Sequence, residues 1–494
     1  MQIGLSALTM ERKIRLDMKQ YFVGVDVGSA NVVMVVGSRS EGSELLDIEG
    51  VSIQESKKSI KEGRLCTTLP STVLNLSYAI KEAKEELEEA LGIKIEQAYF
   101  GWGNSDTRCV IVDDFVPVKN KKTGVIGKED VNILRQLLRQ VKTESCSEKI
   151  FEISPLCYYV NGQRRTLDPV GMQGSWLKGE YLLSIGLNDQ INTLKQLHHR
   201  VGMEIQKVFV NPMITFPLLV SEQEAEEGVV IVDIGSEVTD ITIVREKRVH
   251  YFRSIAVGAE LINADLRSIL PKGANYSKIK HLYGTALSND IAENQVIQVG
   301  NKEVVHRNIA TVIEARLMDI AELVAKAVRE SGLESQIVHG YVLTGGTAAT
   351  DKIEQLFERE TGRPCRRAEQ LYGIGSKPQD CEITPGQHAA VAIMMQAAKF
   401  ASSYVVEAEP APKAVEPQPQ PHTEPTTPAV EPVAKVEDAP KVVTVPLPTT
   451  PVQKPVTPKK EEDKTAEPKT GTLAKFKRLV NISRWMGGED NKSK

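Results

Sequence analysis

The chain has 494 residues, 41% of them hydrophobic and 26% charged, and its formal net charge is -4 at pH 7. This length allows several folded domains. The slight negative charge does not favour nucleic acid as a partner, and none is expected. Six cysteines without a C-x-x-C pair predict free thiols in a reducing compartment. The sequence has neither a bilayer-spanning apolar run nor the residue order of a signal peptide, which predicts a cytosolic protein unless something else attaches it to a membrane.

One short phrase occurs twice, as VGVDVGS at 23–29 and as VIVDIGS at 230–236. In each copy an apolar strand runs into Asp and Gly-Ser, and a second β-rich run follows. This pattern predicts two hairpins with acidic, glycine-turned tips. Glycine lets backbone N–H groups approach a phosphate, and Asp26 or Asp233 could hold a hydrated Mg²⁺. The alternative for either copy alone is an ordinary buried strand ending in an Asp-Gly turn.

The remaining folded part alternates strands and helices, which favours an α/β architecture. The expected elements are a helix at 77–91, strands at 97–102 and 151–160, a helix at 131–142, a strand at 181–186, a helix at 189–201 and a strand at 205–210.

A third glycine-rich site follows further along the chain. There an apolar strand ends at Gly345-Gly346, before a helix over 351–361. A helix N-terminus with glycine access suits a nucleotide's phosphate or ribose, although such junctions are also common packing features.

The composition changes near residue 402. Residues 410–468 carry 15 of the 25 prolines and almost no aromatic residues, which predicts a disordered linker. Beyond it, residues 472–486 form an amphipathic pattern with a basic face. The alternatives are an anchor on anionic lipid and a helix that docks on the body or on a partner groove.

The order of hairpin, inserted unit, hairpin, Gly-Gly junction and closing helix resembles the actin and Hsp70 ATPase superfamily. More narrowly, the chain resembles the bacterial cell-division family FtsA. The superfamily's two phosphate motifs match 24–31 and 233–240, and its adenosine motif matches 342–347. A Pro-Val-Gly turn at 168–172 is similar to the one that closes the domain inserted in FtsA proteins.

The resemblance implies an α/β, actin-like (ribonuclease H-like) two-lobed ATPase fold with an inserted small α+β domain, a disordered C-terminal linker and a terminal amphipathic helix. Its expected domains are an N-terminal extension at 1–19, subdomain 1A at 20–93, 181–210 and 381–402, inserted subdomain 1C at 94–180, subdomain 2A at 211–257 and 318–380, subdomain 2B at 258–317, the Pro-rich linker at 403–471 and the amphipathic membrane-targeting helix at 472–486.

The resemblance also implies a site for ATP and Mg²⁺, in which Asp26 and Asp233 hold the metal through water. The implied nucleotide-binding residues are Asp26, Gly28, Ser29, Ala30, Asn31, Asp233, Gly235, Ser236, Glu237, Gly258, Lys280, Gly284, Gly345, Gly346 and Thr347. The implied membrane-binding residues are Leu473, Phe476, Lys477, Arg478, Leu479, Val480, Ile482, Arg484, Trp485 and Met486.

The function implied by the family is that of an ATP-binding, actin-like cell-division protein. It would polymerise on the cytoplasmic face of the inner membrane at the division site, as a peripheral membrane protein on anionic lipid. It would tether the ring of FtsZ, a tubulin-like GTPase, through a surface within 258–317, and help to recruit later division proteins. The alternatives are an ATP-hydrolysing enzyme of the same fold, such as a chaperone or kinase, and a pilus-type inner-membrane adaptor.

Several residues depart from the superfamily where chemistry would occur, among them Asn31, where the first motif often has Lys or Thr. Glu237 and Val238 stand where relatives have glycine and threonine, and Asn211 stands where many ATPases carry the glutamate that polarises water. An added carboxylate repels phosphate, and Asn has no basicity. We therefore expect ATP to bind and its hydrolysis to be weak or absent, with no confident catalytic residue.

Overall fold

The computed structural model describes residues 19–40, 42–56, 60–61, 64–65, 70–141, 143, 145 and 147–406. Most of the N-terminal extension, the Pro-rich linker beyond residue 406 and the membrane-targeting helix lie outside the described residues. The last described helix, α13 (His388–Val406), extends into the range predicted for the linker.

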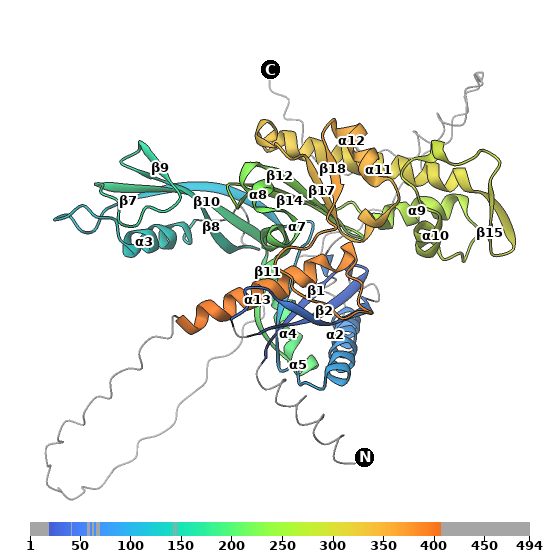
Figure 1. Cartoon of the computed structure of the whole chain (residues 1–494), viewed down its shortest axis with the longest axis horizontal. Coiled ribbons are helices and arrows are strands. Elements are labelled where there is room, and N and C mark those ends of the chain that lie inside the picture. The colour runs from blue at the N-terminus through green and yellow to red at the C-terminus, as the bar shows by residue number, and fades with distance from the viewer. Residues whose placement is uncertain are drawn as a thin grey trace, which may run out of the picture. The chain divides into compact units, whose positions relative to one another are not determined.

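A five-stranded sheet forms the first lobe (Figure 1). Its strands, in their order across the sheet, are β11 (Glu204–Val210), β6 (Gln97–Trp102), β1 (Gln20–Val27), β2 (Asn31–Arg39) and β3 (Asp47–Glu55). Both faces are covered, since Val23 and Val25 pack with α2 (Pro70–Leu91), whereas Phe22 joins the core that contains α13. Burial on two faces explains why these strands read as continuous apolar runs.

The sheet of the second lobe contains the other copy of the repeated phrase. In order, its strands are β18 (Cys365–Arg367), β17 (Tyr341–Thr344), β12 (Val229–Ile234), β13 (Thr239–Arg245) and β14 (Arg248–Ile255). Val230 and Val232 pack with α11 (His306–Glu330) and α12 (Ile353–Thr361) on one face. A smaller part of this lobe contains α9 (Ala259–Ile269), α10 (Tyr276–Tyr283), β15 (Val296–Val299) and β16 (Lys302–Val305).

The insertion, seen on the left of Figure 1, has four antiparallel strands and one helix. Its strands continue the sheet of the second lobe, because β7 follows β14 in one nine-stranded sheet. Its elements are β7 (Arg108–Pro117), α3 (Lys128–Leu138), β8 (Glu148–Val160), β9 (Arg164–Thr166) and β10 (Trp176–Leu187). Leu134 and Leu138 of α3 pack on one face of the sheet. A single residue pair, Arg108 with Arg253, joins β7 to β14 of the second lobe.

Short elements connect these units. They are β4 (Ile60–Lys61), β5 (Arg64–Leu65), α4 (Asn188–Gln196), α5 (His198–Val201), α6 (Asn211–Ile214), α7 (Phe216–Leu219), α8 (Glu222–Glu227) and the 3₁₀ turns η1 (Ser288–Asp290), η2 (Glu334–Gln336), η3 (Gly346–Ala349) and η4 (Pro385–Gln387).

The structure places the limits of the insertion differently from the predicted 94–180. Strand β6 pairs in parallel with β1 and belongs to the first lobe, whereas the whole of β10, to Leu187, pairs with β7 and β8. Strand pairing between distant segments, which local sequence does not show, sets both limits.

Helix boundaries also shift. The helix predicted at 189–201 is interrupted at Leu197, whose amide bonds to the Leu194 carbonyl as in a 3₁₀ turn. Helix α2 begins earlier than predicted, at Pro70, because proline is well tolerated in the first turn of a helix.

No helix in the described part of the chain is long and apolar enough to cross a membrane. The four cysteines that the structure describes, Cys109, Cys157, Cys365 and Cys381, are free thiols, as predicted for them.

Candidate nucleotide-binding site

The two copies of the repeated phrase form hairpin tips of the same geometry. In the first, the Gly28 amide donates to the Asn31 carbonyl at 3.0 Å, and in the second the Gly235 amide donates to the Val238 carbonyl at 2.9 Å. Each glycine therefore closes its own turn, and its N–H is not directed at a ligand. If a phosphate binds at these tips, we expect its donors among the amides that follow the glycines, beginning with Ser29 and Ser236.

Residues in the second tip occupy the same turn positions as residues in the first. Ser236 corresponds to Ser29, Glu237 to Ala30, and Val238 to Asn31. Glu237 is half-buried, whereas Ala30 is exposed. The two tips thus differ in chemistry and not in backbone form.

Three carboxylates lie close to these tips. Asp26 and Asp233 precede the glycines on β1 and β12, and Asp240 lies directly opposite Asp233 on β13. Burial raises the pKa of Asp26 to about 6, and burial together with Asp240 and Asp26 raises the pKa of Asp233 well above its usual range. Burial and the Asp26 carboxylate also raise the pKa of Asp240, to about 7. The three side chains therefore interact electrostatically across the two lobes.

A buried asparagine borders this cluster. The Asn211 side-chain amide donates to Asp26 Oδ1 at 2.8 Å, while Asn211 Oδ1 is buried without a hydrogen-bond partner. Gly101 and Gly103 make room for the cluster, since a Cβ atom there would lie 2.2 Å from Asn211 Oδ1 and 3.0 Å from Asp240 Oδ2, respectively. The Asp240 Oδ1 atom is likewise buried and unpaired.

The donor set fits a hydrated cation better than a directly ligated one. Among the described residues, no three His, Cys, Asp or Glu side chains are placed to ligate one metal ion together. Mg²⁺ keeps several waters and takes few protein ligands, so water could bridge it to Asp26 and Asp233 and satisfy the unpaired oxygens nearby. A bound Mg²⁺ would supply positive charge that offsets the carboxylates and phosphates.

Helix α9 begins directly against the second tip. The Ala259 and Glu260 amides donate to the Gly235 and Ser236 carbonyls at 3.1 and 2.7 Å. Gly258 permits this approach, because a Cβ atom there would lie 2.5 Å from the Ser236 carbonyl oxygen.

Two further predicted residues belong to α10 and the turn after it. Lys280 is on α10, where burial lowers its pKa and nearby Glu260 partly offsets this effect. Gly284 follows α10, and a Cβ atom there would lie 2.2 Å from the Lys280 carbonyl oxygen. Lys280 is therefore near Glu260, whose amide bonds to the second tip.

The third glycine site joins the same cluster. Gly345 has a φ of +84°, and a Cβ atom there would lie 2.3 Å from Asp233 Oδ1, so only glycine fits. The Thr347 hydroxyl donates to the Gly235 carbonyl at 3.3 Å. A Cβ atom at Gly346 would instead meet no protein atom within 4 Å, which leaves this position open toward a ligand.

All the predicted nucleotide residues thus lie on the two tips, on α9 and α10 or at the Gly-Gly junction. Asp240 was missed as a site residue, although it lies within the second matched motif and follows from hairpin register: the turn from Gly235 to Val238 sets it opposite Asp233. His388 was also missed. Its Nδ1 bonds to the Thr344 hydroxyl at 2.8 Å, and no local motif marks it.

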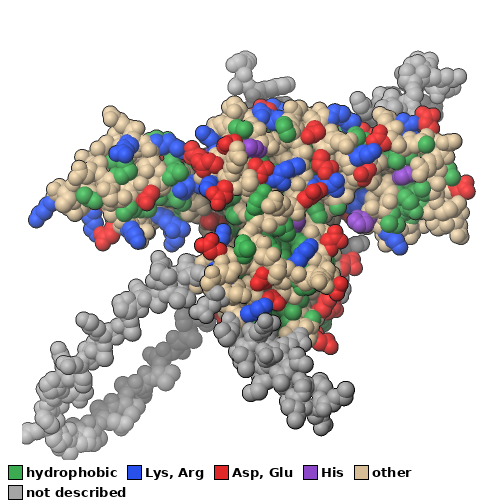
Figure 2. All heavy atoms as spheres, in the orientation of Figure 1, with side chains coloured by type: hydrophobic (Ala, Val, Ile, Leu, Met, Phe, Trp, Pro, Cys, Tyr) green, Lys and Arg blue, Asp and Glu red, His purple; other side chains and the backbone are tan. Residues whose placement is uncertain are grey.

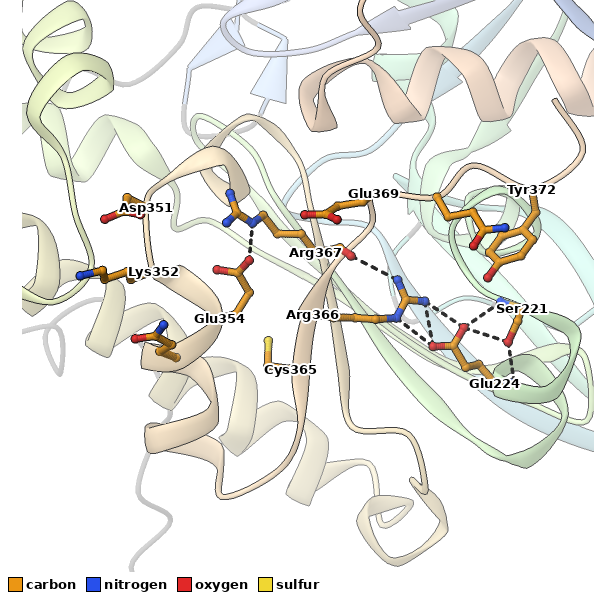
Figure 3. A pocket seen from close by; sticks show the side chains of 12 residues that line it. Ser221, Glu224, Asp351, Lys352, Glu354, Cys365, Arg366, Arg367, Glu369 and Tyr372 are labelled. Carbon is orange, nitrogen blue, oxygen red and sulfur yellow. Dashed lines mark hydrogen bonds and ion pairs between the residues drawn. The ribbon is translucent and has the colours of Figure 1, made fainter. Parts of the chain in front are cut away.

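A separate hollow of about 780 Å³ lies beside β18, α8 and α12 (Figure 3). None of the predicted nucleotide residues lines it. Its arginines are paired, Arg366 with Glu224 at 2.8 Å and Arg367 with Glu354. We therefore assign the candidate nucleotide site to the hairpin tips.

Two lobes whose Asp-Gly hairpins, Gly-Gly junction and inserted domain follow this order define a protein of the actin-like ATPase fold. The family model for the cell division protein FtsA matches residues 230–392, and the model for the SHS2 domain inserted in FtsA matches 104–184. The latter range coincides closely with the insertion from β7 to β10.

Comparison with individual proteins points to the same family. The chain is 25% identical to the FtsA of Pseudomonas aeruginosa over 352 residues, which cover 70% of this chain and 82% of that one. It is 26% identical to the FtsA of Bacillus subtilis over 351 residues, with coverages of 69% and 76%. A solved PilM–PilN type IV pilus biogenesis complex has the same fold, with a TM-score of 0.55 at 12% identity, covering 76% of this chain and 98% of that one. The chain belongs to the FtsA family of cell division proteins.

Proposed function

We propose that this chain binds ATP with Mg²⁺ between its lobes, assembles into filaments on the cytoplasmic face of the inner membrane and tethers the FtsZ ring to it. The observation that carries the nucleotide part is the meeting of two matching hairpin tips, three carboxylates and the open Gly346. The tip amides would hold phosphates, and Asp26 and Asp233 would orient hydrated Mg²⁺.

Gly346 offers a direct test of nucleotide binding. Gly346→Ala adds a methyl group that meets no protein atom, so the fold should be unchanged. Calorimetry should show ATP and ADP binding to the parent chain, and affinity for ATP weaker by about tenfold or more in the variant, which corresponds to about 1.4 kcal/mol.

Gly127→Ala, in the insertion, is the matched control, because its Cβ atom would have only ordinary contacts. It should bind ATP like the parent. Equal ATP affinities of the parent and Gly346→Ala would show that nucleotide does not bind next to Gly346.

The metal part of the proposal is tested by the dependence of ATP affinity on Mg²⁺. Asp233→Asn removes a charge from the proposed metal side of the site, and Asp26→Asn does the same while keeping an acceptor for Asn211. The parent should lose ATP affinity when EDTA replaces Mg²⁺, and the variants should respond much less. An equal EDTA effect in the parent and both variants would contradict the role of these carboxylates.

We propose further that nucleotide acts mainly as a conformational ligand, whose differential affinity for two states sets filament competence. Asn211, which bonds to Asp26, has no basicity to activate water, and Glu237 adds negative charge at the second tip. Phosphate release by the parent should therefore remain close to that of Asp26→Ala. Sustained release well above that level would favour an ATP-hydrolysing enzyme.

The membrane anchor is assigned to residues 472–486, which lie outside the described residues. Its basic and apolar faces suit an interface of anionic lipid. The full chain should pellet with vesicles of phosphatidylglycerol and phosphatidylethanolamine, more than with phosphatidylcholine alone. A chain ending at residue 471 should stay in the supernatant, and equal pelleting of both chains would contradict the anchor.

We place the contact with FtsZ in subdomain 2B, within 258–317. In this range Leu282 and Val296 expose 59% and 52% of their surface. Leu282→Ser with Val296→Ser should reduce co-sedimentation with FtsZ polymers, whereas Val338→Ser, at an equally exposed site outside 2B, should not. Unchanged co-sedimentation of the double variant would move the contact elsewhere. Self-association and recruitment of later division proteins are part of the same proposal.

A further inference from the structure

Strand β7 has one long edge that the described part of the chain leaves without a strand partner. One edge of β7 pairs with β10 from Arg108 to Pro117, without a register shift. On the other edge, strand pairing with β14 is limited to Arg108 and Arg253, and beside this pair Cys109 Sγ bonds to the Phe252 backbone. The described residues provide no further strand along that edge.

The backbone groups on this edge can be assigned by alternation along the strand. The Thr107 carbonyl accepts from the Ser254 amide of β14 at 3.3 Å, so it faces the β14 side. Because successive residues alternate, the amides and carbonyls of Ile111, Asp113 and Phe115 face the same side. The Phe115 amide bonds locally to Asp114 Oδ1, which agrees with an outward direction.

Alternation also places the side chains of these residues on one face. Ile111 and Phe115 expose 52% and 63% of their surface, and the Phe115 ring packs edge-on against Trp176 with centroids 6.1 Å apart. Asp113 lies between them and pairs with Lys178 at 2.6 Å. Figure 2 shows hydrophobic patches among charged side chains on the surface of the insertion. The edge thus presents an apolar, acidic, apolar order.

Strand β18, at one end of the nine-stranded sheet, has a protected edge. At β18 the Cys365 amide bonds to the Glu358 carboxylate at 3.1 Å, and the Arg367 carbonyl accepts from the Arg366 side chain at 3.2 Å. Figure 3 shows how Arg366 is held beside this strand by Glu224. Natural sheets block or charge their edges in this way to prevent unwanted pairing. On β7 part of the edge is blocked in the same way, since the Phe115 amide bonds to Asp114 Oδ1, but the described residues provide no such bond to the amides of Ile111 and Asp113.

We propose that the β7 edge binds an extended segment of a partner protein, which adds to the sheet as a further strand. Main-chain hydrogen bonds to Ile111 and Asp113 would provide affinity, and alternate side chains would provide specificity. The segment carries apolar residues beside Ile111 and Phe115 and a cationic residue beside Asp113. This proposal does not depend on nucleotide or on the membrane anchor.

Charge favours such a segment over a second copy of this chain. Symmetric pairing of two β7 strands that buries Ile111 against Phe115 would set Asp113 opposite Asp113 of the copy. Like charges directly opposite each other destabilise a strand pair, whereas opposite charges stabilise it.

The probe is a fluorescein-labelled peptide, STVTKTVTS, with blocked ends, which places Val, Lys and Val on one face. Its binding to the full chain is followed by fluorescence anisotropy, and amide exchange is followed with and without peptide. We expect saturable binding, slower exchange at Ile111 and Asp113, and about fivefold weaker binding of STVTETVTS. Absence of binding by STVTKTVTS, or equal binding of the two peptides, would overturn the proposal.

Two variants locate the site. Asp113→Pro removes an outward amide without removing a bond to β10, and it should weaken binding about tenfold or more. Asp113→Lys should reverse the preference toward STVTETVTS, whereas Asp380→Lys, at an exposed site outside the insertion, should not.

Thermal unfolding confirms that each variant is folded. Unchanged peptide binding by Asp113→Pro, or unchanged preference in Asp113→Lys, would refute the β7 site. Sedimentation of the chain without peptide tests whether a second copy of the chain binds the edge instead. Self-association that is lost in Asp113→Pro would assign the edge to a second copy and overturn the proposal.

Discussion

Replacing His388 with glutamine should change how the stability of the chain depends on pH. His388 begins α13, is only 2% exposed and bonds through Nδ1 to the Thr344 hydroxyl. Burial lowers the pKa of this histidine to about 4, whereas an unfolded chain should keep a value near 6.5. His388→Gln keeps a side chain that can hydrogen-bond and removes the titration.

The direction of this pH dependence follows from which state, folded or unfolded, binds the proton. Below about pH 6.5 the unfolded histidine takes up a proton and the folded one does not, so the parent loses stability as pH falls and the loss levels off near pH 4. The full difference of about 2.5 pKa units corresponds to about 3 kcal/mol, and the part reached at pH 5 is about 2 kcal/mol. Above pH 8 the histidine contributes no pH dependence.

Urea unfolding of nucleotide-free protein, followed by circular dichroism between pH 5 and 8, measures this linkage. The free energy of unfolding of the parent should fall by about 2 kcal/mol more than that of His388→Gln over this range. Subtracting the unfolding free energy of one chain from that of the other cancels the contribution of the carboxylates, which titrate in both chains. Parallel curves would show that His388 takes up a proton in the folded state as readily as in the unfolded one.

Three other substitutions follow from the packing and from the site. Gly24→Ala would set a Cβ atom 2.5 Å from the Ala390 carbonyl oxygen, and the strained contact should cost about 1–3 kcal/mol in urea unfolding; an unchanged midpoint would contradict it. Phe357→Ala, at a fully buried position, should cost about 3–5 kcal/mol, and a smaller loss would indicate local collapse. Asn211→Asp replaces the hydrogen bond to Asp26 with a like-charge contact, so the melting temperature should fall without Mg²⁺ and recover partly when Mg²⁺ is added. An equal fall with and without Mg²⁺ would show that the proposed cation does not bind near Asn211.

The sequence predicts the hairpins well because their determinants are local. Apolar runs, an Asp-Gly-Ser tip and a second apolar run lie within a short stretch, and the two tips close in the same way at Gly28 and Gly235. The same register places Asp240 opposite Asp233, so this residue could have been found from the sequence by counting across the turn.

Features set by distant contacts could not be predicted in this way. Strand β6 belongs to the first lobe because it pairs with β1, and nothing in residues 97–102 names that partner. His388 meets Thr344 across 44 positions of sequence, and its low pKa comes from burial, which the surrounding residues do not show. The free edge of β7 likewise depends on where β14 stops pairing.

The two hairpin tips have the same backbone form and differ in their side chains. This difference affects whether the site would bind nucleotide or also hydrolyse it. The second tip carries half-buried Glu237 at the position of Ala30, while Asn211, not a glutamate, contacts Asp26. A site that kept its phosphate turns and lost its basic group would retain the means to bind nucleotide more readily than the means to hydrolyse it. Such a site could still bias two arrangements of the lobes, provided that nucleotide binds one arrangement more tightly. The contacts of α9 with the second tip and of Thr347 with Gly235 give that bias a physical route, because they tie the turn to both parts of the second lobe.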